Sequence, residues 1–261
     1  MTRAHIGRLA GSAAVASVGV FLLLPTLIVL PMSFSGAEML VFPPSGFSLR
    51  WYTRYFSDPA WQAATWHSLV VAIAAALIAT VLGTSAAMAL VRGRVPLAGM
   101  LRSLLLLPMI VPAIVTAVAA FRVFSVVGLT DTLPGLALAH ALLGLPFVVI
   151  NVSAVLRRTD PRIEAAARSL GATPWLAFRR VTLPLILPGV AAGAVFAFLT
   201  SFDEVVVALF LTGIDSATLP VQMWSGIRFE INPVVAAVSV LLVALSTAGF
   251  GLFAALRRRD A

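Results

Sequence analysis

Residues 157–184 read RRTDPRIEAAARSLGATPWLAFRRVTLP, and this polar stretch lies between two long apolar segments. Asp160-Pro161 is typical of a helix start, because the carboxylate accepts from free backbone N–H groups and proline suits the first helical position. Thr173-Pro174 repeats this signal. Gly171, between the two, can take the left-handed conformation that ends a helix. The stretch therefore predicts two short helices with a sharp elbow at Gly171.

Both predicted helices carry an apolar face. The residues that fall at helical spacing are Ile163, Ala166, Ala167 and Leu170 on the first helix, and Trp175, Phe178 and Val181–Thr182 on the second. An apolar face that projects below a membrane has to be buried. Either it packs under the protein's own spans, or the small-residue helix enters a groove of a cytoplasmic partner. The residues alone leave both arrangements open.

The apolar segments beside this stretch belong to a set of six, each long enough for a transmembrane helix of about 20 residues. They are residues 9–34, 66–91, 101–125, 134–156, 185–212 and 233–256. The chain is 61% hydrophobic and 11% charged, whereas soluble domains carry about 25% charged residues. We expect residues 1–261 to form a single all-α membrane domain of six transmembrane helices.

All 18 basic residues are arginines, and their distribution predicts the orientation of the chain. With the N-terminus inside, Arg50, Arg54, Arg122 and Arg228 lie outside. The inside segments then hold Arg3, Arg8, Arg92, Arg94, Arg102, Arg157, Arg158, Arg162, Arg168, Arg179, Arg180, Arg257, Arg258 and Arg259. Positive charge accumulates on the cytoplasmic side of membrane proteins. We therefore expect a multi-pass protein of the bacterial inner membrane with both termini in the cytoplasm, and no nucleic-acid partner for the net charge of +8.

The missing residue types restrict the chemistry of the chain. Without lysine, the chain cannot form a phosphate-binding loop of the G-x-x-x-x-G-K-[ST] type, so any ATP chemistry has to come from a partner. Without cysteine, there is no disulfide and no thiolate metal site. His67 and His140 stand apart from other ligand types in the sequence, and we interpret both as packing or interfacial residues. We expect no catalytic residue and no metal site.

The fifth apolar segment contains two adjacent carboxylates, Asp203 and Glu204. An aspartate at the centre of a membrane helix costs about 2.5–3.5 kcal/mol. On a continuous helix from Leu185, Asp203 lies about 27 Å along the axis, in the outer part of the span. The carboxylates either pair with an arginine such as Arg122 or Arg228, or one of them attracts cations at the outer mouth of a transport pathway.

Two further features of the apolar segments remain open. Pro108 and Pro112 free backbone carbonyls in the third segment, which predicts either a packing kink or a broken helix that lines a pathway. Trp224 lies before the sixth segment, either as an interface anchor or as a pathway aromatic.

The stretch between the fourth and fifth segments resembles the EAA loop of bacterial ABC-importer permeases. That pattern is E-A-A, three residues, G, nine residues, I, one residue, L-P. The residues that match it are Ala166, Ala167, Gly171, Val181, Leu183 and Pro184, with valine in place of isoleucine. The glutamate position holds Ala165, and Glu164 stands one residue earlier. The resemblance implies a MetI-like fold whose loop is a coupling helix that docks in a cleft of an ATPase. It assigns ATPase coupling to Glu164, Ala165, Ala166, Ala167, Ser169, Leu170, Gly171 and Ala172.

A second resemblance concerns the transported solute. The stretch 201–206 is similar to the S-F-D-[DE]-x-V pattern of spermidine/putrescine permeases, and residues 107–112 and 218–233 add to the likeness. It implies half of a translocation pathway for a small cationic solute such as a polyamine. The pathway residues would be Ser201, Phe202, Asp203, Glu204 and Trp224. Permeases for opines, phosphonates, thiamine and ferric iron share parts of these patterns, so such solutes remain alternatives.

The resemblance also implies partners: a second homologous permease subunit, two ATPase subunits that bind ATP and Mg²⁺, and a periplasmic substrate-binding protein. The chain itself would bind no cofactor and would not be an enzyme. A secondary transporter working alone often shows internal repeats and charges near the bilayer midplane. An intramembrane enzyme needs a convergent group of catalytic side chains. The sequence shows none of these clearly, and both alternatives leave the inner loop unexplained.

Overall fold

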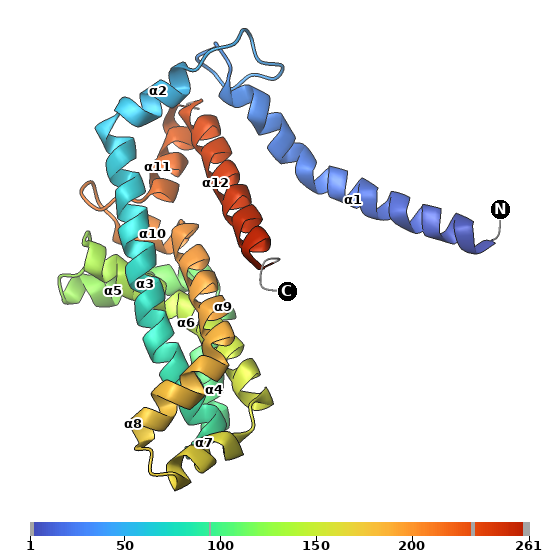
Figure 1. Cartoon of the computed structure of the whole chain (residues 1–261). Coiled ribbons are helices and arrows are strands. Elements are labelled where there is room, and N and C mark those ends of the chain that lie inside the picture. Colours follow the sequence, from blue (N-terminus) through green and yellow to red (C-terminus); the bar gives the residue numbers. More distant parts are fainter. Residues whose placement is uncertain (1–2, 94, 231–232, 258–261) are drawn as a thin grey trace. The chain divides into compact units, whose positions relative to one another are not determined.

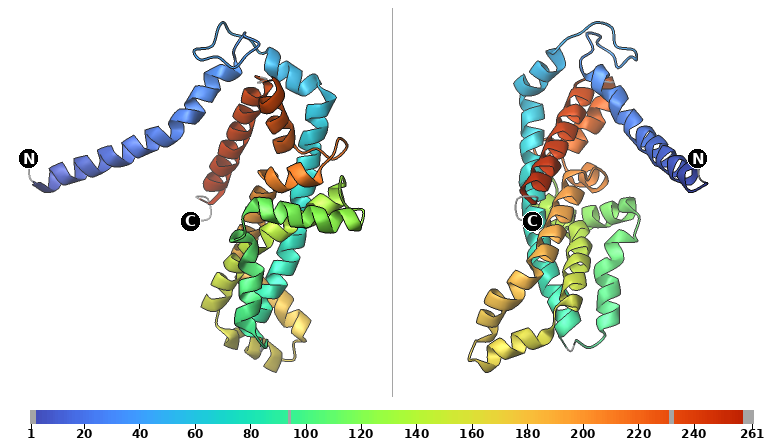
Figure 2. Two further views of the ribbon diagram at one scale, coloured as in Figure 1. Left: turned by 180° about the vertical axis from the view of Figure 1, so that it is seen from behind. Right: turned by 45° about the vertical axis from the view of Figure 1, so that its right-hand side comes forward.

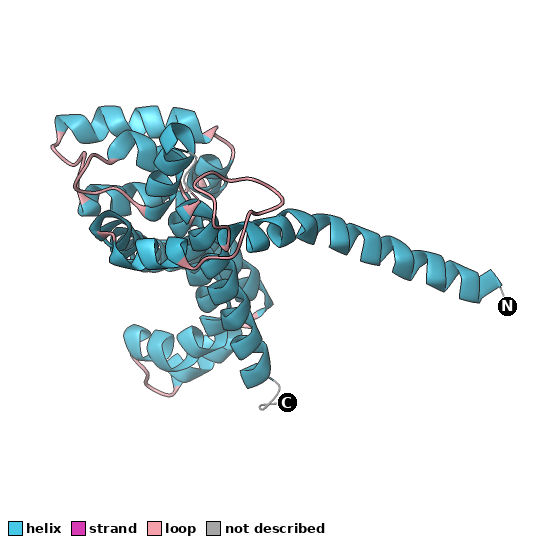
Figure 3. Cartoon of the chain, turned by 90° about the horizontal axis from the view of Figure 1, so that it is seen from above, coloured by secondary structure: helices cyan, strands magenta, loops and turns pink. Residues whose placement is uncertain are grey.

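The structure is a computed structural model, and it describes residues 3–93, 95–230 and 233–257. Arg94, Arg258 and Arg259 of the inside arginines, and Ile231 and Asn232 before the sixth segment, lie outside the described residues. Apart from one isolated bridge pair, every regular element in the described part is helical (Figures 1 and 3). This confirms the predicted fold class. The chain divides into two compact units, residues 1–62 with 223–261 and residues 63–222.

The first unit contains α1 (Arg3–Ser33), α2 (Arg50–Ser57) and α12 (Val234–Arg257), together with the short η3 (Gly226–Glu230). Both α1 and α2 contact α12. Trp51 of α2 is buried, and its indole N–H donates to the carbonyl oxygen of Ser35 at 2.9 Å. This bond ties α2 to the loop that follows α1.

The second unit holds most of α3 (Pro59–Arg92) and the helices of the predicted loop. Its other elements are α4 (Ala98–Leu106), η1 (Leu107–Met109), α5 (Ala113–Val126), α6 (Leu133–Arg158), α7 (Pro161–Ser169), α8 (Pro174–Ala177), η2 (Phe178–Thr182), α9 (Leu183–Phe202), α10 (Val206–Leu211) and the start of α11 (Leu219–Ser225). In this unit α6 packs along α9, and α5 packs on α10 (Figure 2).

Small residues bring the helices of the second unit close to α6. Val148 of α6 is fully buried between two glycines, Gly83 of α3 and Gly193 of α9. A Cβ atom added at Gly193 would lie 2.8 Å from the Cα atom of Val148, and one added at Gly144 would lie 2.9 Å from the Cβ atom of Ala197. Glycines let membrane helices approach at backbone distance, where van der Waals packing holds them together. A side chain larger than the hydrogen atom of glycine would therefore push these helices apart.

The described part of the chain contains four helices long and apolar enough to cross a membrane, or five if one bent pair counts as a single span. The four are Val15–Ser33, Pro59–Arg92, Leu133–Arg158 and Pro174–Phe202, which correspond to the predicted first, second, fourth and fifth segments. The sixth predicted segment lies in the helix α12 (Val234–Arg257), and the apolar stretch described within it is Val234–Ala248.

The third predicted segment, residues 101–125, is the bent pair. Ala98–Met109 and Ala113–Val126 meet at an angle of 101°. Pro108 lies in the 3₁₀ turn η1, and Pro112 stands immediately before α5 with ψ at 134°, outside the helical region. Proline removes a backbone donor and cannot continue the preceding turn. Of the two arrangements that the sequence left open, the structure has the broken helix.

The fifth predicted segment, residues 185–212, differs at both ends. At its start, α8 runs through the five-residue π-helical turn η2 directly into α9, so the second loop helix is continuous with the span. At its end, α9 stops at Phe202, and the short α10 begins at Val206. Asp203 and Glu204 therefore lie in a break between two helices. The expectation that they stand inside one continuous helix was wrong.

Candidate functional site

The elbow of the loop has the predicted geometry. Asp160 accepts a hydrogen bond from the backbone N–H of Arg162 at 2.8 Å, and Thr173 accepts from that of Leu176 at 3.3 Å. These bonds satisfy donors that a helix start leaves free. Gly171 has φ of +91°, and its N–H donates to the carbonyl oxygen of Arg168 at 3.0 Å. The predicted helix starts and the elbow are confirmed.

The apolar residues of the loop are exposed in the second unit. Leu170 is 90% exposed, Trp175 67% and Ile163 47%. Ala165, Ala166 and Ser169 are also exposed, and Ala167 and Ala172 are half-buried. Within the described residues, Ile163, Ala166 and Leu170 of this face are thus not packed under the protein's own spans, whereas Ala167 is partly covered. The Trp175 ring instead contacts the ring of its neighbour Phe178, with 5.5 Å between the centroids.

Glu164 behaves differently from the rest of the loop. Its Oε2 atom accepts a hydrogen bond from the hydroxyl of Thr182 at 2.6 Å and forms an ion pair with the guanidinium of Arg92. Arg92 is the last residue of α3, and Thr182 is the last residue of η2. The carboxylate that the resemblance assigns to ATPase coupling is therefore bound to two elements of its own chain.

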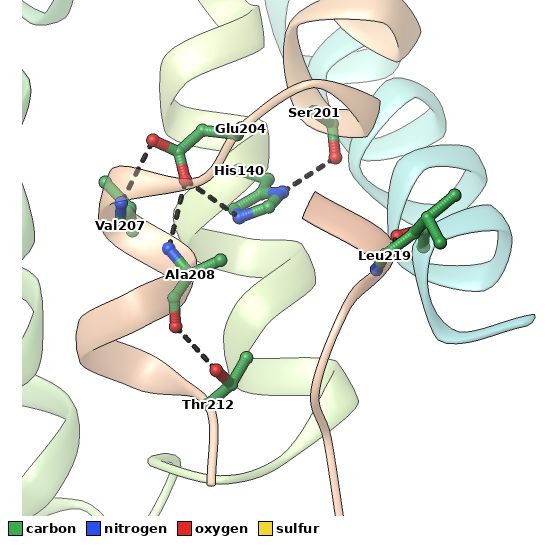
Figure 4. A network of polar contacts seen from close by, with 8 residues as sticks. His140, Ser201, Glu204, Val207, Ala208, Thr212 and Leu219 are labelled. Carbon is green, nitrogen blue, oxygen red and sulfur yellow. Dashed lines mark hydrogen bonds and ion pairs between the residues drawn. The ribbon is translucent and has the colours of Figure 1, made fainter. Parts of the chain in front are cut away.

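The break between α9 and α10 is organised around the second carboxylate, Glu204 (Figure 4). Its Oε1 atom accepts from the backbone N–H of Val207 and its Oε2 atom from that of Ala208, both at 3.0 Å. These are N–H groups at the start of α10 that have no partner within the helix. The largely buried side chain of Glu204 thus caps α10 from the residues that precede it.

His140 joins the two sides of this break (Figure 4). Its Nδ1 atom lies 2.8 Å from the hydroxyl oxygen of Ser201 at the end of α9, and its Nε2 atom lies 3.6 Å from Oε2 of Glu204. The imidazole is buried, and it reaches both residues from α6. His140 is thus a buried residue between helices that in addition contacts two polar side chains. No local pattern indicates the cluster, because Ser201 is 61 positions away along the chain.

The other predicted pathway residues are not part of this cluster. Asp203 is exposed at the end of α9, and among the described residues its carboxylate has no hydrogen-bond or ion-pair partner. Phe202 is half-buried and stacks on Phe198 with 5.7 Å between the ring centroids. Trp224 belongs to the first unit and is exposed. The two carboxylates therefore differ: Glu204 is bonded to the fold, and Asp203 makes no polar side-chain contact with the residues that the structure describes.

Within the second unit, the described contacts of Glu204 are with two backbone N–H groups and His140, and none of them is with Arg122. No three side chains among the described His, Asp and Glu residues gather as metal ligands would. The polar groups of the break join the end of α9, the start of α10 and α6.

Comparisons with known proteins place the chain in a family. The family described as "Binding-protein-dependent transport system inner membrane component" matches residues 79–259. The spermidine/putrescine transport system permease protein PotC of Escherichia coli (strain K12) is 33% identical over 241 residues, which are 92% of this chain and 91% of the relative. The putrescine transport system permease protein PotI of the same strain is 34% identical, over 88% of this chain and 84% of the relative.

A solved structure supports the same fold. A chain from the crystal structure of a bacterial ABC transporter involved in the import of the acidic polysaccharide alginate superposes with a TM-score of 0.80. The match covers 97% of both chains at 16% identity, so this likeness concerns the fold alone. The family match and the sequence identity over most of the chain assign the family, which the likeness in fold alone does not do. The chain belongs to the family of inner-membrane components of binding-protein-dependent transport systems, and it is a permease subunit of an ABC importer.

Proposed function

We propose that this permease subunit moves a small cationic solute, of the polyamine class, through a pathway whose outer part includes Asp203. Two named relatives, a spermidine/putrescine permease and a putrescine permease, are similar to this chain over most of its length. The observation that carries the proposal within the structure is the exposed carboxylate of Asp203 at a break in an apolar span. A carboxylate beside a low-dielectric pathway favours a cation electrostatically.

The structure favours Asp203 over Glu204 for this role. Both carboxylate oxygens of Glu204 are occupied by backbone N–H groups, and His140 lies beside one of them. To bind a solute, Glu204 would have to release the start of α10. Asp203 has no such bonds in the described residues, so it can face a passing ammonium group without loss of structure.

The proposed partners are a second homologous permease subunit, two ATPase subunits that bind ATP and Mg²⁺, and a periplasmic substrate-binding protein. We propose that α7 docks on one ATPase subunit through the exposed face that contains Ile163, Ala166 and Leu170. Alanines leave a thin helix that fits a groove, and the exposed leucine gives it an apolar anchor. The arginine bias of the inside segments supports cytoplasmic termini and thus a cytoplasmic loop.

Reconstitution in liposomes tests which class of solute the transporter moves. The permease is purified with the products of its neighbouring genes and placed in liposomes, and ATP-driven uptake of radiolabelled spermidine and putrescine is compared with uptake of thiamine, a phosphonate, an opine, ferric iron and a neutral sugar. We expect saturable uptake of the polyamines. Uptake of another of these solutes with no polyamine uptake would reject the proposed substrate class and leave the importer assignment intact.

Copurification tests the docking face. Leu170→Glu places a charge on the exposed anchor of α7 and should reduce recovery of the ATPase with the permease. Ile214→Glu is the matched control, because Ile214 is 96% exposed in the same unit but lies outside the loop. Equal recovery of the ATPase with both variants would reject docking through this face.

A further inference from the structure

Glu164 and Ala167 are the two half-buried residues of α7, three positions apart, while the other residues of the helix are exposed. Residues at this spacing share one face of a helix. Glu164 therefore points away from the exposed apolar residues, toward the protein's own elements. Its two partners, Arg92 and Thr182, confirm this direction.

One carboxylate oxygen of Glu164 joins three elements of the second unit. The Oε2 atom, on α7, forms an ion pair with the guanidinium of Arg92 at the end of α3. It also accepts a hydrogen bond from the hydroxyl of the buried Thr182, at the junction of η2 and α9. Arg92 is 72 positions from Glu164, so the chain itself makes no short link between α3 and α7. A π-helical turn such as η2 often marks a functional position inside a helix.

We infer that Glu164 is a positioning residue that transmits movement of α7 to α3 and α9, and that it does not contact the ATPase directly. The chain connects α7 to α6 through Thr159-Asp160 and to α8 across the elbow at Gly171. The Glu164 contacts add a connection to α3 and a second one to the start of α9. A displacement of α7 then moves two spans together. This inference rests on the proposed coupling role of the loop.

The two sides of the short helix α7 then have different roles. The exposed residues Ile163, Ala166 and Leu170 bind the partner, and the half-buried side with Glu164 holds the spans. Removal of Glu164 should leave binding of the ATPase intact and weaken the mechanical link. Coupling energies between distant sites are typically 1–3 kcal/mol, or about 5- to 150-fold.

The experiment uses the complete transporter in liposomes, with the permease variants Glu164→Ala and Glu164→Gln. Three quantities are measured: ATPase recovered with the permease, the rate of ATP hydrolysis, and solute transported per ATP hydrolysed. We expect Glu164→Ala to leave the amount of ATPase recovered with the permease unchanged. It should lower the solute transported per ATP by at least about fivefold. Glu164→Gln keeps an acceptor for Thr182 but loses the ion pair, so its transport per ATP should fall between those of the wild type and Glu164→Ala. The exchanged pair Arg92→Glu with Glu164→Arg should restore most of the ratio.

Arg162→Gln is the matched control, because Arg162 is an exposed charged residue of the same helix. A second readout follows the position of α7 itself. The chain has no cysteine, so Ser85→Cys on α3 and Ser169→Cys on α7 introduce two unique sites for spin labels. We expect a narrow distance distribution between them in the otherwise wild-type chain and a broad one with Glu164→Ala.

Two results would overturn the inference. Unchanged transport per ATP in Glu164→Ala would show that the contacts transmit nothing. Loss of the ATPase from Glu164→Ala but not from Arg162→Gln would show that Glu164 binds the partner directly. Failure of the docking proposal is distinguishable, since it appears as full ATPase recovery with Leu170→Glu, whatever the Glu164 variants do.

Discussion

The elbow at Gly171 gives the sharpest test of the coupling loop, because three substitutions there have graded structural effects. No atom lies within 4 Å of the position that a Cβ atom would occupy at Gly171, so added volume is tolerated. The strain comes from φ of +91°. A left-handed backbone costs an ordinary residue about 1–2 kcal/mol, whereas asparagine tolerates it better.

Proline has the largest effect of the three. It fixes φ near −65° and removes the N–H group that donates to Arg168 at 3.0 Å. The elbow then has to change direction. Alanine keeps the hydrogen bond but carries the strain of about 1–2 kcal/mol, which corresponds to about 5- to 30-fold in a local equilibrium constant. The expected order of solute transported per ATP is Gly171→Asn near wild type, then Gly171→Ala, then Gly171→Pro.

The assay is uptake and ATP hydrolysis by the reconstituted transporter. Gly128→Ala is the matched control, because Gly128 has φ of +71°, also has no atom within 4 Å of the position that a Cβ atom would take, and lies in the same unit outside the loop. It should carry a similar strain and leave transport per ATP unchanged. Wild-type coupling in Gly171→Pro, or an equal loss in Gly171→Asn and Gly171→Pro, would refute the argument from elbow geometry.

Three further outcomes are expected. Asp203→Asn should reduce uptake of a polyamine more than that of a neutral solute and change unfolding stability by less than about 0.5 kcal/mol, because its side chain is exposed. Glu204→Ala should instead lower stability by about 1–2 kcal/mol in thermal unfolding, since α10 loses its cap; equal stability of the two variants would contradict this assignment. Gly193→Leu should destabilise by about 1–3 kcal/mol through contact with Val148, whereas Gly99→Ala, with open space around it, should be neutral or stabilising.

Local features of the chain were predictable from the sequence, because they depend on interactions between residues a few positions apart. Asp160 and Thr173 cap the helices that follow them, and Gly171 makes the elbow between them. Apolar segments of about 20 residues predicted membrane helices for the same reason, since hydrophobicity and length are properties of a continuous stretch. The fold class and the importer family followed from these features and from the spacing of the loop residues.

The positions of helix breaks were decided by the tertiary structure. Apolar residues lie on both sides of residues 110–112 and 203–205. At the first position the prolines left a kink and a broken helix open, and at the second the sequence predicted an unbroken span. A break in an apolar segment is stable only where other groups satisfy the freed backbone. At residues 203–205 this is done by Glu204, which bonds to the N–H groups of Val207 and Ala208.

The roles of the carboxylates also depended on contacts between distant parts of the chain. Asp203 and Glu204 could not be separated from the sequence, because the helix was expected to continue through them and so offered no free N–H groups for Glu204 to cap. His140, which also approaches Glu204, comes from another helix. It assigned Glu164 to a partner, whereas α3 and η2 approach closely enough for Arg92 and Thr182 to bind it. A sequence determines where helices can form and how they begin and end. Which side chains meet between helices depends on how glycines such as Gly193 let those helices pack.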